Sequence, residues 1–309
     1  MKNKVFIAGQ EGMVGSAIYS LLKKKKFKII NCPRNKVDLT NQHQVDSWFK
    51  KNKPNIVINA AGRVGGILDN STYLSDYIYI NTMIGMNIIN SSLKYKVSKL
   101  INLGSACIYP RSVKQPIKEE YLLSSFLEKT NEGYALAKIS CLKYCEYIRK
   151  KHKKYFISLQ PTNLYGIGDN FNLKSSHVMP ALVKKFYLAN KFRKKTVEIW
   201  GSGKVKREFL NVEDLASAVH FCLKKKISYP FINVGSGDYI SIKRLALIIK
   251  KISGYKGKIV FNKKYPDGVI ERKLDITKLK RMGWKKEINL YQGIESYYKY
   301  FESIADINE

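Results

Sequence analysis

Residues 4–22 read KVFIAGQEGMVGSAIYSLL, and this stretch carries the strongest indication of fold in the chain. It opens with a short apolar run typical of a buried strand and ends with apolar side chains at helical spacing. Between them stand three glycines, each three residues from the next: Gly9, Gly12 and Gly15. Such glycines permit a tight turn, close approach of the backbone to a pyrophosphate and close helix–strand packing. The stretch therefore predicts a dinucleotide-binding turn, with Met13 and Val14 also contacting the cofactor.

Alternating strands and helices continue this unit through the first half of the chain. Strands are expected at residues 4–8, 28–31, 55–60, 99–103 and 156–160. Helices are expected at residues 15–22, 45–50, 80–93 and 134–150. The alternation predicts an α/β fold, a doubly wound parallel sheet of the Rossmann type with helices on both faces.

After Pro161 the pattern loosens, and residues 170–180 read as a loop. Shorter strands are expected at 197–200, 208–210, 231–234 and 258–261, with helices at 212–223, 241–252, 277–281 and 290–301. We therefore expect residues 1–165 to form the dinucleotide-binding domain, with a further segment near 208–236. Residues 166–309 would mainly form a smaller C-terminal α/β lobe that binds substrate.

Composition excludes several classes of protein. The 309 residues are 45% apolar and 26% charged, as in folded globular chains. No apolar run is long enough to span a membrane. The N-terminal MKNKVFIAGQ lacks the apolar core of a signal peptide, so we expect a cytoplasmic protein. Five cysteines without a CxxC predict neither a disulfide framework nor a zinc site, and we expect no metal.

The formal charge of +32, from 56 Lys and Arg against 24 Asp and Glu, would suit nucleic acid or a membrane surface. However, only nine of these cations are arginines, and the lysines are spread along the chain in short runs. We therefore favour solvated lysines and a polyanionic small-molecule substrate. Neither nucleic acid nor a membrane is expected as a partner.

The end of the second expected strand distinguishes NAD from NADP. NAD sites usually carry an acidic residue there, which binds the ribose 2′-hydroxyl. This chain instead reads Asn-Cys-Pro-Arg, and the guanidinium of Arg34 could pair with a 2′-phosphate. The sequence favours NADP, the alternative being that Arg34 is one more surface cation. Further cofactor contacts are expected from Asp38, Leu39, Ala60, Ala61 and Gly62.

Tyr134 and Lys138 form a YxxxK pair on an expected helix, and this spacing places both side chains on one face. A lysine ammonium near a phenol favours the phenolate and should lower the phenol pKa toward neutrality. Such a tyrosine can protonate a carbonyl oxygen while a hydride reaches the carbon, and the lysine can hold the nicotinamide ribose. Ser105 lies two residues after the strand 99–103 and can hydrogen-bond the same oxygen.

This order of motifs matches the extended short-chain dehydrogenase/reductases, and within them the chain resembles the GDP-L-fucose synthase family. The resemblance runs almost end to end, through AGQEGMVGSAI, NAAGRVGGI, LGSACIYP, TNEGYALAK, PTNLYG, SSHVMPAL and WGSGKVKREFL. It implies an NADPH-dependent 4-reductase of a GDP-linked 4-keto sugar that is also a 3,5-epimerase. It also implies a homodimer that makes precursors of capsule, lipopolysaccharide or another surface glycan.

The resemblance further implies a role for each matching residue. Ser105, Tyr134 and Lys138 would form the reductase set, and Cys107 and His177 the epimerase pair. Thiol and imidazole can both exchange protons near neutral pH, as epimerisation beside a carbonyl requires. The plainer alternative is a small buried cysteine and an ordinary loop histidine. Further cofactor residues implied are Pro161, Asn163 and Leu164, and further sugar-nucleotide residues are Ala106, Asn163, Lys185, Trp200, Arg207 and Asp267.

Departures from the family pattern leave the sugar open. Arg63 replaces a usual Lys, Ser175 a frequent Asn, and Asn211 and Glu213 the usual His and Asp after REFL. The main alternative is a reductase-only relative that acts on an already epimerised GDP-4-keto sugar such as a heptose. A basic nucleic-acid-binding protein on a dinucleotide-binding scaffold is a remote alternative. The segment after Ser105 carries no carboxylate, which disfavours the related dehydratases.

Overall fold

The structure, a computed structural model, describes residues 4–33, 35–173, 175–265, 267 and 269–307. Its largest sheet has six parallel strands in the order β2-β1-β3-β4-β5-β9. These strands are β1 (Lys4–Ala8), β2 (Lys28–Ile30), β3 (Ile56–Asn59), β4 (Lys99–Leu103), β5 (Tyr155–Pro161) and β9 (Phe231–Val234). The predicted doubly wound parallel sheet is thereby confirmed.

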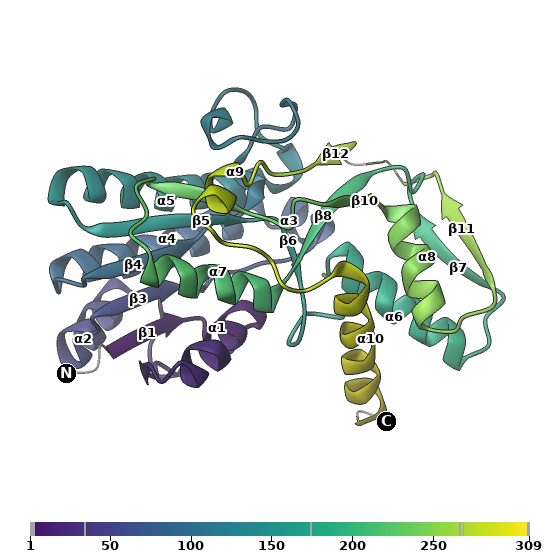
Figure 1. The fold of residues 1–309 in the computed structure, drawn as a ribbon, viewed down its shortest axis with the longest axis horizontal. Helices are drawn as coiled ribbons and strands as arrows, with labels where there is room; N and C mark the ends of the chain where they lie inside the picture. The colour runs from purple at the N-terminus through teal and green to yellow at the C-terminus, as the bar shows by residue number, and fades with distance from the viewer. Residues whose placement is uncertain (1–3, 34, 174, 266, 268, 308–309) are drawn as a thin grey trace.

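Helices cover both faces of this sheet (Figure 1). Successive residues of a strand point to opposite faces, so Val5 and Ile7 pack in one core and Phe6 and Ala8 in another. The first core is shared with α1 (Met13–Lys24), α7 (Val212–Lys224) and α9 (Thr277–Arg281). The second is shared with α2 (Gln42–Asn52), α4 (Leu74–Lys94) and α5 (Glu132–His152).

A smaller lobe lies beside the sheet, and two short sheets form its framework (Figure 1). The first consists of β6 (Asn163–Tyr165), β8 (Lys206–Asn211), β10 (Tyr239–Ser241) and β12 (Glu271–Arg272). The second pairs β7 (Thr196–Trp200) with β11 (Lys258–Asn262). Helices α6 (Val178–Lys191), α8 (Ile242–Ile252) and α10 (Leu290–Ile307) enclose a separate apolar core with them.

Several elements of the structure were not expected from the sequence. Helix α6 begins at Val178, inside the expected loop, and Pro180 lies in its first turn. Proline is tolerated there because the first N–H groups of a helix have no intrahelical partner. Strands β6, β10 and β12, and the six-residue helix α3 (Ile67–Thr72), are too short for periodicity to reveal them. Among the helices described, none is long and apolar enough to cross a membrane.

Candidate active site

The glycine-rich turn joins β1 to α1 in a form that leaves room for a ligand. Gly9 has φ +77°, and a Cβ there would lie 2.8 Å from Cα of Ala61. A Cβ on Gly15 would lie 2.0 Å from the carbonyl oxygen of Gly9, so this position also requires glycine. Gly12 is exposed, and its nearest neighbour to an added Cβ is 3.5 Å away. The helix then starts at Met13, and the first N–H groups of a helix, which have no intrahelical partner, are suited to binding a pyrophosphate.

The order of the strands places this turn where a dinucleotide would bind. β1 lies between β2 and β3, so the chain reverses direction across the sheet beside β1, which is where open α/β sheets bind ligands. Ala60 and Ala61 follow β3 there, and Ala61 touches the glycine turn. A Cβ on Gly62 would lie 3.6 Å from Nζ of Lys138, which connects the expected cofactor cleft to the expected catalytic lysine.

Several of the remaining expected cofactor residues already have hydrogen-bond partners within the protein. Asp38 accepts hydrogen bonds from the backbone N–H and hydroxyl of Thr40, and these bonds lower the pKa of its carboxyl. The carbonyl of Leu39 accepts from Asn87, and the amide of Asn163 donates to the carbonyl of Glu208. Pro161 ends β5, and Leu164 is in β6. Arg34 lies outside the described residues, so its pairing with a 2′-phosphate stays a prediction.

Ser105, Tyr134 and Lys138 meet at the carboxyl end of β4. Ser105 follows that strand, and its hydroxyl is close enough to the phenol of Tyr134, in the first turn of α5, to act on the pKa of that phenol. Lys138 is one turn further along α5, buried, with Nζ 5.5 Å from the centre of the Tyr134 ring. Its ammonium donates to the carbonyl of Leu103 at 3.0 Å. This geometry fits a tyrosine that protonates a carbonyl oxygen held by a serine.

The electrostatics of this group differ from our expectation. Burial raises the pKa of Tyr134, with a further contribution from Cys107, while the nearby hydroxyl of Ser105 acts in the opposite direction. Burial also lowers the pKa of Lys138. The expectation that the lysine brings the phenol pKa near neutrality is therefore wrong for this structure, because burial is the largest influence on that pKa and raises it. Tyr134 is a protonated phenol at neutral pH, which is the form that donates a proton.

Cys107 lies in the same loop as Ser105, in a short 3-10 turn spanning Ala106–Ile108. Its backbone N–H donates to the Ser105 hydroxyl at 3.2 Å, and its thiol is close enough to influence the pKa of Tyr134 and of Arg207. The thiol thus lies between the reductase set and the second lobe.

His177 reaches the region from a different direction, as the residue that caps the N-terminus of α6. The side chain is accessible to solvent, yet enough protein surrounds it that desolvation lowers its pKa. The loop before it is anchored, since the carbonyl of Ser175 accepts the N–H of Gly66 at 2.7 Å. Within the described part of the chain, His177 makes no hydrogen bond to Cys107 or Tyr134.

The other expected sugar-nucleotide residues form two groups. Arg207, in β8, is close enough to Cys107 and Asp267 for both to act on its pKa, which burial lowers to about 10. Lys185 and Trp200 form a second group, with Nζ of the lysine 5.2 Å from the centre of the indole. Tyr265 stacks on that indole at 4.2 Å. An aromatic pair with an ammonium over it is suited to a planar base.

Gln160 was not predicted, although the structure places it directly beneath the catalytic loop. It is fully buried at the end of β5, and its Oε1 accepts the backbone N–H of Ser105 at 3.0 Å. A Cβ on Gly104 would lie 1.9 Å from that oxygen. The sequence did offer one indication of this role. Gln160 is a polar residue in a strand expected to be buried, and a buried polar side chain needs a hydrogen-bond partner.

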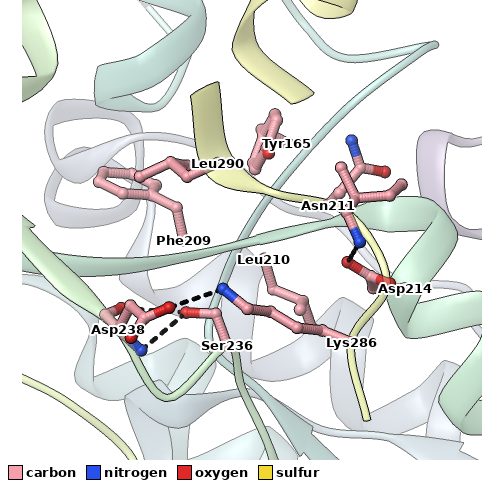
Figure 2. A pocket seen from close by; sticks show the side chains of 10 residues that line it. Tyr165, Phe209, Leu210, Asn211, Asp214, Ser236, Asp238, Lys286 and Leu290 are labelled. Atoms are coloured by element: carbon pink, nitrogen blue, oxygen red, sulfur yellow. Dashed lines mark hydrogen bonds and ion pairs between the residues drawn. The ribbon is translucent and has the colours of Figure 1, made fainter. Parts of the chain in front are cut away.

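A small cavity elsewhere in the fold contains none of the expected catalytic residues. Figure 2 shows it between Tyr165, Phe209, Asn211, Asp214 and Lys286. Its free space of about 10 Å³ is enough for about one water molecule. Lys286 donates to Asp238 at its edge, at 2.7 Å. The cavity is therefore a packing feature between β8 and the segment that precedes α10.

The fold and the Ser–Tyr–Lys set beside a dinucleotide turn define an extended short-chain dehydrogenase/reductase. The sequence profile described as "NAD dependent epimerase/dehydratase family" matches residues 5–235. A GDP-L-fucose synthase from Sinorhizobium fredii is 45% identical over 304 residues, 98% of this chain and 97% of the relative. The GDP-L-fucose synthase of Escherichia coli is 42% identical over 310 residues, 97% of each chain. The protein belongs to the NAD dependent epimerase/dehydratase family and, within it, to the GDP-L-fucose synthase family.

Solved structures agree with this assignment. A GDP-6-OMe-4-keto-L-xylo-heptose reductase from Campylobacter jejuni is 35% identical and covers 98% of each chain, with a TM-score of 0.92. A GDP-mannoheptose C4 reductase from the same organism, with NADP bound, is also 35% identical, covers 97% of this chain and 98% of its own, and has a TM-score of 0.89. The cofactor in the second structure is the one that the sequence of this chain favours.

Proposed function

We propose that the protein reduces carbon 4 of a GDP-linked 4-keto sugar with NADPH and epimerises carbons 3 and 5 of the same sugar. The observation that carries the proposal is that Ser105 and Cys107 share one loop against Tyr134, so one bound ketone can meet both sets of groups. Residues 1–165, with the segment near 208–236, would hold the dinucleotide. Residues 166–309 would mainly hold the sugar nucleotide, with Arg207 against its diphosphate and Trp200 against its base.

Each residue has a defined task in this reaction. Cys107 and His177 remove and return protons at the carbons beside the ketone, which inverts them. Ser105 and Tyr134 hydrogen-bond the ketone oxygen and polarise it. NADPH, when bound, supplies the hydride to carbon 4. Tyr134 gives its phenolic proton to the oxygen, and Lys138 steadies the phenol and the ribose of the cofactor.

Incubation of the enzyme with NADPH and candidate GDP-4-keto sugars tests this proposal, with products analysed by NMR in deuterated water. We expect oxidation of NADPH, a hydroxyl at carbon 4, and deuterium at carbons 3 and 5. Oxidation with no ketone reduced, or no reaction with any GDP-4-keto sugar, would contradict it.

A reductase without epimerase activity is the second candidate, and the heptose reductases among the solved structures favour it. It would act on a GDP-4-keto heptose whose other centres are already set. Reduction of such a heptose with no deuterium entering the sugar would identify the protein as a reductase without epimerase activity.

The product in either case would feed a surface glycan such as capsule or lipopolysaccharide, and we propose the cytoplasm as the compartment.

Apolar side chains on α4 and α5 support a homodimer. Ile78, Tyr79, Leu136 and Tyr147 are exposed on these two helices, with Tyr79 63% and Tyr147 60% exposed. Exposed apolar patches of this kind mark protein interfaces. Light scattering should give the mass of two chains, and Tyr79→Asp should shift it toward the mass of one chain.

We expect no specific binding to DNA. A steep salt dependence of DNA binding without affinity for NADPH would revive the nucleic-acid alternative.

A further inference from the structure

Arg272 joins the second lobe to the catalytic loop. It lies in β12, a two-residue strand of the smaller lobe, more than 160 positions along the chain from that loop. Its Nη1 donates to the carbonyl of Ala106 at 2.8 Å, and its Nη2 donates to the carbonyls of Tyr109 at 3.0 Å and Pro110 at 3.1 Å. One guanidinium thus spans the turn that contains Cys107.

The turn needs such a donor because it is only three residues long. A short 3-10 turn leaves most of its carbonyls without internal partners, and its hydrogen bonds are poorly aligned. The bond from Tyr109 N–H to the carbonyl of Ala106 is 3.3 Å long, and Tyr109 and Pro110 are buried. The planar fork of arginine can meet carbonyls at both ends of the turn, whereas a lysine ammonium acts from a single point.

The strand that carries Arg272 is itself fixed in place. The N–H of Leu274 donates to a carboxylate oxygen of the buried Glu208 at 2.8 Å. On the other side, the N–H of Ile117 donates to the carbonyl of Lys273 at 2.7 Å. Arg272 therefore extends from a rigid base, as a residue that fixes the geometry of another segment must.

We propose that Arg272 is a positioning residue, which holds the loop 105–110 so that Ser105 and Cys107 face the same ketone. The inference rests on the proposed function. It assigns Arg272 no contact with substrate or cofactor. Because Ser105 serves reduction and Cys107 serves epimerisation, loss of this one side chain should slow both reactions together, unlike a change in either set alone.

The test compares Arg272→Ala and Arg272→Lys with Glu271→Gln, a matched control on the same strand. The control removes only the ion pair that Glu271 forms with Lys206 at 2.7 Å. Three quantities are measured: kcat and KM for the ketone, the rate of deuterium exchange without NADPH, and the dissociation constant of NADPH. Amide hydrogen exchange over residues 104–110 reports the order of the loop independently of activity.

For Arg272→Ala we expect reduction and exchange to slow by a similar factor of about 10 to 100, as misplaced catalytic groups do, with KM and NADPH affinity little changed. Amide exchange in the loop should be faster than in Glu271→Gln, and Arg272→Lys should fall between Arg272→Ala and the wild type. If Arg272→Ala fails to fold, the same measurements on Arg272→Lys test whether Arg272 positions the loop.

A raised KM with unchanged kcat would overturn the proposal, because it would make Arg272 a substrate ligand. Wild-type values in every assay would overturn it too. Failure of the proposed function has a different signature, since the wild-type enzyme itself would then turn over no GDP-4-keto sugar.

Discussion

The backbone N–H of Ser105 donates to Oε1 of Gln160 at 3.0 Å, which ties the catalytic loop to the neighbouring strand of the large sheet. Gln160 is fully buried, and only a glycine at position 104 leaves room for its side chain. The loop is therefore held from the sheet as well as from the smaller lobe.

Removing this acceptor should weaken the fold and the catalytic geometry. Gln160→Ala leaves the Ser105 N–H unpaired and opens space beneath the loop, so we expect a loss of about 1–3 kcal/mol in the free energy of unfolding. Urea denaturation measures it, with the exposed Gln292→Ala as a control. A stability equal to that of the control would show that the bond contributes nothing.

Tyr134→Phe should nearly abolish NADPH oxidation while leaving cofactor binding intact. The variant lacks the only hydroxyl of that side chain, and loss of a positioned general acid typically costs about 100- to 10,000-fold in rate. Stopped-flow absorbance measures the rate, and fluorescence titration measures NADPH affinity. Tyr291→Phe, at an exposed site on α10 outside the proposed dimer interface, should behave as wild type. A substantial residual rate would mean that another group donates the proton.

Cys107→Ala should separate the two reactions. Deuterium exchange at carbons 3 and 5 should stop, because the thiol that exchanges protons is gone. Reduction of a ketone supplied in the correct configuration should continue, because Ser105 and Tyr134 remain. NMR follows both, and Cys32→Ala is the control for a general effect of losing a thiol. Exchange at the wild-type rate would remove Cys107 from the epimerase role.

The exchange reaction should also report the protonation state of His177. Desolvation lowers the pKa of this imidazole below 6.5, so it is neutral at pH 7 and can accept a proton. As pH falls through that lowered pKa the imidazole becomes charged and the exchange rate should drop, with a midpoint below 6.5. A pH series of exchange rates checks this, and His177→Gln should lack that step. A midpoint above 6.5 would contradict the prediction that desolvation lowers the pKa of His177.

Asp169 should make stability fall as pH rises. It lies in the loop after β6, accepts a hydrogen bond from Tyr297 at 2.8 Å, and burial raises its pKa from 3.8 to about 6. Between these values the folded state binds more protons than the unfolded state, so the free energy of unfolding declines from about pH 4 to about pH 6.

Asp169→Asn removes this titration while keeping an oxygen for Tyr297. We expect the variant to be more stable than wild type at pH 7 by about 1–3 kcal/mol and to lose the decline. Urea denaturation at several pH values measures this, with the exposed Glu11→Gln as control. An unchanged slope would show that Asp169 ionises at its ordinary pKa.

Much of this architecture could be predicted from the sequence, because strands buried on both faces and glycines at a phosphate turn have strong local patterns. The positions of Ser105, Tyr134 and Lys138 followed from the same patterns. Helix α6 (Val178–Lys191) was not predicted at all, and its first turn was taken as part of a loop because of Pro180, although a proline in a first turn is compatible with a helix.

Contacts made across the fold could not be predicted in the same way. Nothing near Gln160 or Arg272 in the chain reveals that each bonds to the loop after β4, since both contacts depend on tertiary packing. The pKa of Tyr134 was mispredicted for a related reason. Helical spacing places a lysine nearby, but burial, which raises that pKa, is a property of the whole fold.

The late return of β9 to the large sheet limits how this enzyme can be divided. The strand pairs with β5 only after the chain has built β6, β7, β8 and α6 of the smaller lobe. A fragment cut near residue 165 would therefore lack the edge strand β9 as well as α7 and α9, which pack with α1 on one face of the sheet. Exchange of substrate lobes between relatives would have to carry three separate segments, divided by α7 and β9 and again by α9, rather than a single C-terminal piece.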